Sequence, residues 1–188
     1  MHRYHMFDTG LGPVGVAWSE RGLTRLQLPE YDRGATERRL RARSGGAAPG
    51  GPAAEVGETI AAIESYLAGE RVDFSGIALD LDGVGDFPRR IYAAARRIGW
   101  GQTTTYGDLA RHAGSPGAAR AVGQALGRNP IPIIIPCHRI LASGGKVGGF
   151  SAHGGATTKE RLLALEGVHL HDDLPLLPGL PPIQRKRS

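Results

Sequence analysis

Residues 129–141 read NPIPIIIPCHRIL, and the other elements of the C-terminal half are interpreted by how they pack around this segment. Three isoleucines between prolines predict a short, buried, extended segment that delivers the residues after it to a fixed place. Those residues are Cys137 and His138. Cys137 is the only cysteine among 188 residues, which excludes a disulfide within the chain and any multi-cysteine zinc site.

Two interpretations of Cys137 are open at this point. A lone cysteine is usually an inert, small core residue. Pro136 before it, with His138 and Arg139 after it, favours a nucleophile instead. A thiolate near an imidazole and a guanidinium has a lowered pKa, and the thiolate is the reactive species. Neighbours in sequence need not face each other, so the motif alone does not decide between the two.

Two short helices are expected upstream of this segment. Thr105 and Asp108 form a capping-box pattern that begins a helix from Tyr106 to about Ala113. After a glycine-containing turn, Ser115 is expected to cap a second helix that ends near Gly127. Such a pair indicates a helix-turn-helix, although a plain helical hairpin has the same pattern.

The second helix has a face of small side chains with one long cation, Arg120. The small residues are Ala118, Ala119, Ala121 and Gly123. They are too short to contact base edges across a major groove but suit close approach along a minor groove. Arg120 is then either a solvated surface residue or a side chain that enters a base stack. Residues 86–167 hold 11 basic and 4 acidic side chains, against 9 and 12 in residues 1–85, which favours a polyanionic partner.

Downstream of Cys137, a glycine-rich loop at 143–155 leads to a helix with a capping pattern from Thr157 to Glu160. Gly167 is expected to end that helix. Glu166 lies in its last turn, where the helix dipole disfavours an anion. Glu166 is therefore either a solvated glutamate or a buried residue that orients a histidine beside the thiol.

The chain as a whole is predicted to be a mixed α/β (α+β) protein with a β-rich part at 1–85, a helical part at 86–167 and a Pro-rich tail at 168–188. The N-terminal elements expected are strands at 4–7, 14–18, 23–28 and 77–81, a weak helix at 33–43, an exposed and poorly ordered linker at about 44–52, and a helix at 56–67. A further helix is expected from an Asp86 cap to Gly99.

Four motifs in order resemble the O6-alkylguanine-DNA alkyltransferases, also called methylated-DNA–protein-cysteine methyltransferases. They are ARAVG at 119–123, the NP turn at 129–130, PCHR at 136–139 and TKxRLLxLEG at 158–167. The similarity covers about residues 86–167. It implies a small ribonuclease-H-like β domain followed by a helical domain with a helix-turn-helix.

The resemblance also implies roles for individual residues. Cys137 would accept the alkyl group, with His138 as a water-linked base and Glu166 as the acid that orients it. The other implied residues are Asn129, which braces the turn, Tyr106, which helps rotate the nucleotide and donates a proton, Arg120, which fills the vacated stack, and Val147, Phe150 and Ser151, which line the base pocket. Phe150 replaces a tyrosine of many relatives, and the loop at 151–153 is longer than in some of them.

The function implied is stoichiometric transfer of an alkyl group from O6 of guanine, or from O4 of thymine, in double-stranded DNA, with neither cofactor nor metal. A multiple-turnover hydrolase or transferase with Cys, His and Glu is one rival. A lesion sensor that resembles the alkyltransferase-like proteins is another, and Cys137 argues against it because those proteins lack the cysteine. The N-terminus shows no signal segment and no apolar run approaches about 20 residues. We therefore expect no membrane contact, a monomer, and a cytoplasmic or nucleoid location.

Overall fold

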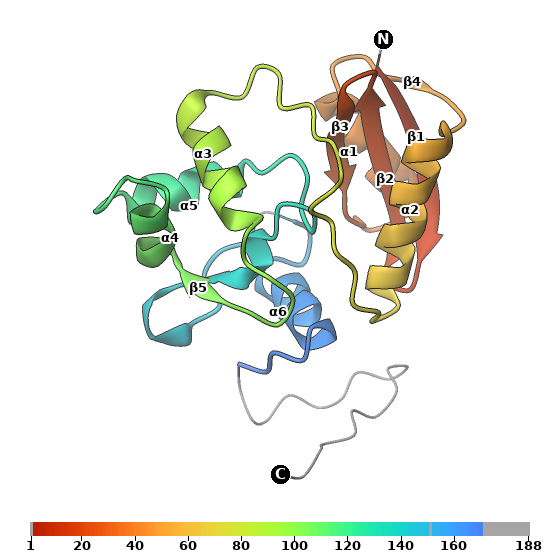
Figure 1. Ribbon diagram of the computed structural model, residues 1–188. Coiled ribbons are helices and arrows are strands. Elements are labelled where there is room, and N and C mark those ends of the chain that lie inside the picture. The colour runs from red at the N-terminus through yellow and green to blue at the C-terminus, as the bar shows by residue number, and fades with distance from the viewer. Residues whose placement is uncertain (1, 151, 171–188) are drawn as a thin grey trace.

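The computed structural model describes residues 2–150 and 152–170. Most of the predicted Pro-rich tail, from residue 171 on, and the predicted pocket residue Ser151 lie outside the described residues. A sheet flanked by helices forms one side of the molecule and a group of helices forms the other, with α6 (Ala156–Leu165) below them (Figure 1). The predicted mixed α/β class is confirmed.

The N-terminal sheet has the strand order β3-β2-β1-β4. Its strands are β1 (Arg3–Thr9), β2 (Gly12–Ser19), β3 (Gly22–Gln27) and β4 (Ala48–Pro49). The first three form the predicted antiparallel meander, and β4 runs parallel to β1. Side chains of β2 alternate between the two faces, so that Val14 and Val16 enter the main core while Ala17 joins a second cluster.

Helices cover both faces of this sheet, α1 (Arg33–Arg43) behind it and α2 (Ala54–Leu67) in front of it (Figure 1). Leu40 of α1 lies so close to β2 that a Cβ atom at Gly15 would be 2.5 Å from its Cδ2. Only glycine allows that approach without movement of the helix side chain. The backbone of β2 therefore packs directly against α1.

Most of residues 44–52 are exposed, as expected, although β4 pairs with the open edge of β1 and Ser44 and Ala47 are buried. A Gly, Ala and Pro composition does not show that a free strand edge is available nearby. Residues 77–81 make only one bridge, Leu23 to Leu79, rather than a strand. Asp80 then turns toward Ser19, whose hydroxyl donates to its carboxylate at 2.5 Å.

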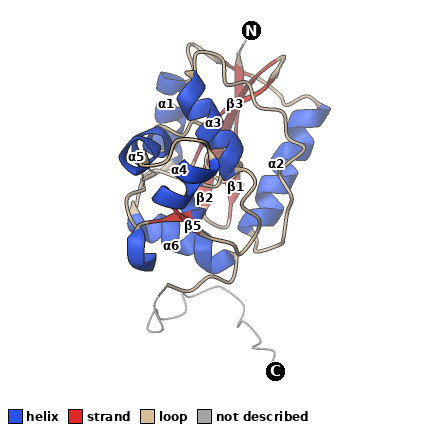
Figure 2. Cartoon of the chain, turned by 60° about the vertical axis from the view of Figure 1, so that its left-hand side comes forward, coloured by secondary structure: helices blue, strands red, loops and turns tan. Residues whose placement is uncertain are grey.

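The C-terminal half is helical as predicted. Its elements are α3 (Asp86–Ala95), α4 (Tyr106–His112), α5 (Ala119–Gly127), the short 3-10 turns η1 (Cys137–Arg139) and η2 (Ser143–Gly145), α6, and a two-stranded parallel sheet of β5 (Thr104–Thr105) and β6 (Ile140–Leu141). Helices α4 and α5 pack together as the predicted helix-turn-helix (Figure 2). Within the described ranges, no helix has both the length and the apolar character that crossing a bilayer requires.

The predicted cap of α4 is confirmed, since the Thr105 hydroxyl accepts from the amide of Asp108 at 3.1 Å. Three other caps were wrong. Helix α5 begins at Ala119 rather than after Ser115, because Gly117 has a φ of +82° that interrupts a helical path. Helix α6 begins at Ala156, ahead of the Thr157 pattern, with Gly155 as its N-cap.

The third wrong cap is at α3, where Gly85 rather than Asp86 is the N-cap. Asp86 is the first helical residue, where its charge still suits the helix dipole. The helix ends at Ala95, and turns lead from there to Gly99. Gly167 follows α6 with a φ of +77°, so the predicted end of that helix is confirmed.

The segment at 129–141 is buried as predicted but is a tight turn rather than an extended strand. Pro132 and Ile135 form a bridge across it, and Ile133 adopts a φ of +73°. A β-branched residue rarely occupies this region of φ, so the surrounding contacts must hold it there. All three isoleucines at 133–135 belong to one core cluster that spans both halves of the chain.

Candidate active site

Cys137 begins η1 directly after the buried turn and is 6% exposed. The side-chain amide of Asn129 donates from Nδ2 to Sγ at 3.2 Å and to the carbonyl of Ile135 at 2.8 Å. Its Oδ1 accepts from the amide of Ile131 at 2.9 Å. Asn129 therefore holds the turn and the thiol in one arrangement, which is the contact pattern expected of a residue that braces the site.

His138 is fully buried and its ring contacts two side chains through one nitrogen. Nε2 lies 2.8 Å from Oε1 of Glu166 and 3.1 Å from the hydroxyl of Tyr66. That hydroxyl donates to the same Glu166 oxygen at 2.8 Å, so its own oxygen is free to accept. We assign the proton to Nε2 because both neighbours can accept from it. Nδ1 is then the basic nitrogen, and it is buried without a hydrogen-bond partner.

Glu166 is a buried acceptor for four residues from three parts of the chain. Besides His138 and Tyr66, it accepts from Nε of Arg139 at 2.9 Å and from the amide of Gly101 at 3.2 Å. Burial raises the pKa of Glu166, but the hydrogen bonds from His138 and Arg139 outweigh that effect and hold it at about 2. Burial lowers the pKa of His138 despite the carboxylate, which favours a neutral ring.

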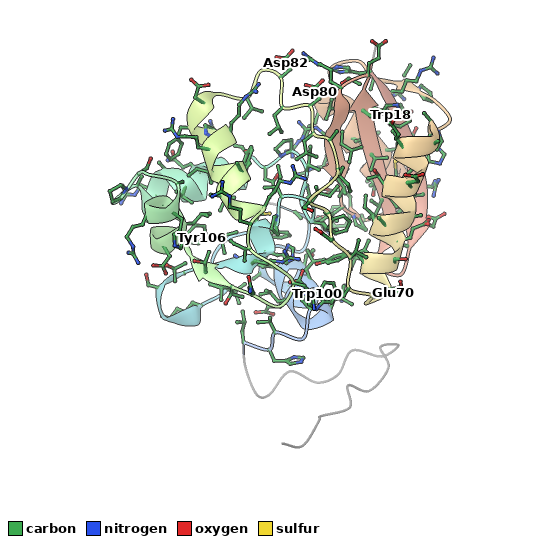
Figure 3. The ribbon with its side chains drawn as sticks, in the orientation of Figure 1. Trp18, Glu70, Asp80, Asp82, Trp100 and Tyr106 are labelled. Atoms are coloured by element: carbon green, nitrogen blue, oxygen red, sulfur yellow. The ribbon has the colours of Figure 1, made fainter. Side chains whose placement is uncertain are left out.

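Aromatic packing fixes the side chain that links this network to the N-terminal half. The ring of Tyr66, from α2, meets Phe74 and Trp100 edge to face, each with centroids 5.5 Å apart. Trp100 lies beside α6 in the loop that also supplies the Gly101 amide (Figure 3). Burial raises the pKa of Tyr66 well above its usual value, so its hydroxyl keeps the proton that it donates to Glu166.

The charge that favours a thiolate comes from an unexpected residue. Burial raises the pKa of Cys137, while the Asn129 hydrogen bond and the charge of Lys159 act to lower it. Lys159 is fully buried and donates from Nζ to the carbonyl of Ile140 at 2.5 Å. Burial lowers its own pKa to about 8. The expected role for the Arg139 guanidinium is wrong, because that group is turned toward Glu166 and the carbonyl of Ile98.

Tyr106 is the first residue of α4, on the side of the molecule away from the four-stranded N-terminal sheet (Figure 3). Nζ of Lys159 lies 5.6 Å from the centre of its ring. Its hydroxyl donates weakly to the carbonyl of Gly149, at 3.4 Å, in the glycine-rich loop. A Cβ atom at Gly123 would be 3.9 Å from the same ring. Gly123 is half-buried and packs beside the ring of Tyr106.

Of the remaining predicted residues, one lines the cavity at Cys137 and others lie on the surface of α5. Phe150 lines a cavity of about 30 Å³ in front of Cys137, together with Pro132. Val147 is partly exposed and does not line that cavity. Arg120 and Ala121 are exposed on α5, and the two alanines before them, Ala118 and Ala119, are half-buried.

Two site residues carried no recognisable signal of a role in the sequence. Tyr66 occupies an ordinary core position of an amphipathic helix, and nothing local connects it to His138. Lys159 is inside the TKxRLLxLEG motif, but a lysine in the first turns of a helix is normally solvated. Among the described residues, no group of three or more His, Cys, Asp and Glu side chains is arranged to hold a metal ion.

Comparisons with known proteins cover nearly the whole chain. Residues 2–81 match the ribonuclease-like domain, and residues 86–168 the DNA-binding domain, of the 6-O-methylguanine DNA methyltransferase models. A methylated-DNA–protein-cysteine methyltransferase from Mycobacterium tuberculosis is 38% identical over 94% of this chain and 99% of its own length. One from Mycolicibacterium paratuberculosis is 48% identical over 57% of this chain and 62% of its own length. The crystal structure of M. tuberculosis OGT in complex with DNA matches with a TM-score of 0.72 at 37% identity, covering 87% of this chain and 92% of that one.

We expect the Glu166 network to stabilise the fold only above acidic pH. The folded protein holds the Glu166 proton less tightly than the unfolded chain does, with a pKa of about 2 against 4.5. This difference corresponds to about 3 kcal/mol, which is present above pH 4.5 and is lost as the pH falls toward 2. Urea unfolding of Glu166→Gln should show that loss already at pH 7, with a flatter dependence on pH below 4.5.

Glu58→Gln is the matched control, because Glu58 is exposed on α2. It should leave both the free energy of unfolding and its dependence on pH close to those of the unmodified protein. Equal effects of the two substitutions would show that the buried network does not stabilise the fold.

Lys159→Met tests the source of the charge beside the thiol. Removing an opposite charge raises the pKa of a thiol, by about one unit for a close pair. Alkylation of Cys137 by iodoacetamide should therefore slow at pH 7, and the midpoint of its pH profile should move upward by about one unit. Lys146→Met, at an exposed loop position, should leave the midpoint in place. An unchanged midpoint in Lys159→Met would refute the assignment.

Proposed function

Because the chain belongs to the 6-O-methylguanine DNA methyltransferase family, we propose that it repairs DNA by moving an alkyl group from O6 of guanine onto its own Cys137. The two family models together match residues 2–81 and 86–168, so the membership concerns both halves. The activity is that of a methylated-DNA–protein-cysteine methyltransferase. The transfer is stoichiometric, since a thioether at Cys137 leaves no thiol for a second reaction.

The observation that carries this assignment is the only thiol in the chain, held by Asn129 at the end of the buried turn and followed directly by a buried His138 whose Nδ1 makes no hydrogen bond. We propose that Nδ1 takes the proton of the Cys137 thiol, either directly or through one water molecule. Glu166 and Tyr66 keep the ring in the tautomer that has this lone pair available. The imidazolium that forms is stabilised by the Glu166 carboxylate, and Lys159 stabilises the thiolate.

The chemical step then needs no external reagent. Sγ of Cys137 forms a bond to the alkyl carbon, and the bond from that carbon to O6 breaks with its electron pair leaving on guanine. A proton neutralises the departing base, and Tyr106 is the proposed donor. The products are a thioether at residue 137 and ordinary guanine in DNA. Each proposed group has its geometry set before DNA arrives, which is how an active site lowers a barrier without reorganisation.

We assign the approach of DNA to the surface of α4 and α5. Arg120 and Ala121 are exposed there, on a half of the chain with a net positive charge. The target base must leave the stack to reach a thiol that is 6% exposed. Unstacking costs a few kcal/mol, and Arg120 is the proposed residue that occupies the gap. Double-stranded DNA with O6-alkylguanine is the proposed partner of a monomer in the cytoplasm or on a bacterial nucleoid.

A hydrolase with repeated turnover is less compatible with this site. Hydrolysis requires a water molecule to attack an acylated thiol inside the site. The cavity at Cys137 holds only about 30 Å³, walled by Pro132 and Phe150. That volume favours one small group transferred once over an acyl intermediate together with a positioned water.

Mixing the protein with a duplex that contains O6-methylguanine should add one methyl group per chain, detected by intact mass and located at Cys137 by peptide mapping. Cys137→Ser should lose transfer entirely, because an alcohol at neutral pH is a far weaker nucleophile than a thiolate. It should still bind the duplex, since residue 137 is buried in η1 and is not part of the exposed surface of α5. Repair of more than one lesion per molecule would contradict the stoichiometric mechanism.

Arg120→Ala should separate extraction of the base from attack on it. Repair of duplex DNA should slow by about tenfold or more, because the extrahelical state loses its support. The reaction of Cys137 with the free base O6-methylguanine, which requires no extrusion, should keep its rate. Both rates are measured under single-turnover conditions.

Arg111→Ala is the matched control, since Arg111 is an exposed arginine of α4 that is paired with Asp108. It should affect duplex repair much less than Arg120→Ala does. Equal slowing on both substrates in Arg120→Ala would place Arg120 in the fold or pocket, and equal retention would make it a solvated surface residue.

A further inference from the structure

Three arginines from the N-terminal half line the cavity that contains the thiol. Arg25 comes from β3, and Arg39 and Arg43 are one helical turn apart on α1. They share the cavity with Cys137 and Pro132. β3 brings Arg25 to the thiol because this strand bonds directly to the C-terminal half. The amide of Leu26 donates to the carbonyl of Pro130 at 3.0 Å.

These arginines are not equally neutralised. Nε of Arg39 lies 3.1 Å from Oε1 of Glu30, a distance that pairs the charges even though the angle is poor for a hydrogen bond. Arg25 and Arg43 form no ion pair with any residue of 2–150 or 152–170. Nε of Arg25 is also buried without a hydrogen-bond acceptor. A buried donor without a protein partner is rare, so Nε of Arg25 is available to an acceptor that enters the cavity.

The two unpaired arginines also affect each other. Burial lowers the pKa of Arg25, and the charge of Arg43 lowers it further. No carboxylate separates the two guanidinium groups closely enough to pair with either. An anion placed between them would relieve this repulsion and satisfy the free donor.

None of the residues that line the cavity belongs to α4 or α5, the proposed DNA surface, and Arg120 and Tyr106 are not among them. Besides the arginines, its walls are the thiol, the Asn129 turn and the loop around Phe150. A substituent on the carbon that Sγ attacks would extend into this space, toward the arginines of the N-terminal half.

The cations are not needed to explain the thiolate. The cation with the largest lowering effect on the pKa of Cys137 is Lys159, on α6. Arg25 and Arg43 therefore have no assigned part in the transfer of a neutral methyl group, and their charge remains available to a substrate.

We propose that Arg25 and Arg43 form a subsite for an anionic group on the transferred alkyl chain, so that the protein accepts O6-carboxyalkyl guanines as well as neutral adducts. The inference rests on the proposed alkyl transfer to Cys137. About 30 Å³ holds about two water-sized groups, which limits the substituent to a short one such as carboxymethyl. In that reaction Sγ bonds to the methylene carbon, the bond to O6 breaks with its electrons leaving on guanine, and the product is S-carboxymethylcysteine.

The proposed subsite would offset the repulsion between an anionic substrate and the thiolate. A carboxylate on the reacting carbon lies next to the attacking thiolate, and two like charges at that distance repel. Guanidinium groups on the far side of the carboxylate offset the repulsion by pairing with it, in the fork geometry that suits carboxylates. A neutral adduct of the same size gains nothing from them.

The test uses three duplexes that differ only in the O6 substituent, which is methyl, carboxymethyl or carbamoylmethyl. Carbamoylmethyl has the size of carboxymethyl but no charge. Single-turnover rate constants are measured for the unmodified protein, Arg25→Gln, Arg43→Gln and the control Arg38→Gln. Arg38 is exposed on the same helix and does not line the cavity. The readout is the ratio of the carboxymethyl rate to the carbamoylmethyl rate, because folding defects cancel in it and inherent reactivity is common to all variants.

We expect this ratio to fall about tenfold in Arg25→Gln and in Arg43→Gln, the size of one charge-assisted hydrogen bond. Arg38→Gln should leave it unchanged, and methyl transfer should persist in every variant. A ratio that stays constant in both cavity variants would overturn the proposal. Equal slowing on all three duplexes would also overturn it, since the arginines would then act on DNA phosphates or on the fold. Absence of methyl transfer in the unmodified protein would instead refute the proposed function.

Discussion

The buried carboxylate of Glu166 is the interaction on which the rest of this structure depends. It accepts hydrogen bonds from α2, from η1 and from the loop after α3, and it lies itself at the end of α6. A buried anion is unfavourable unless donors surround it. Here the donors come from segments as far apart in sequence as Tyr66 and His138. One charge therefore connects both halves and fixes the orientation of the His138 ring.

The thiol is placed in a contrasting environment. The apolar core that surrounds it raises the pKa of Cys137, which protects the residue from indiscriminate reaction. Asn129 and Lys159 oppose that effect with one hydrogen bond and one charge. The protein thus combines a thiol that is largely protonated at rest with a histidine, His138, that is neutral for the same reason. Burial favours the uncharged form of both, and the proposed proton transfer from Cys137 to His138 would create the reactive pair.

Sequence patterns predicted the elements that have strong local signals. They failed where a contact between residues distant in sequence determines the conformation. The helix-turn-helix and the Thr105 cap were predictable, because a capping hydroxyl acts on its own helix. The turn at Ile133 was not predictable. Proline and isoleucine favour an extended segment, and the observed φ of +73° is imposed by packing. The unfavourable position of Glu166 at a helix end did indicate a special environment. Its partner Tyr66 was beyond reach, because 100 residues separate the two.

The hydroxyl that Tyr66 contributes to the His138 ring has a consequence for how such chains diverge. The two halves share a core cluster and this hydrogen bond, so neither is a module that recombination can exchange freely. A phenylalanine at position 66 removes the hydroxyl that donates to Oε1 of Glu166, so the buried carboxylate loses one of its donors. A substitution at residue 66, in the N-terminal half, therefore alters the hydrogen bonding of His138 and Glu166 in the other half, so the three positions are coupled.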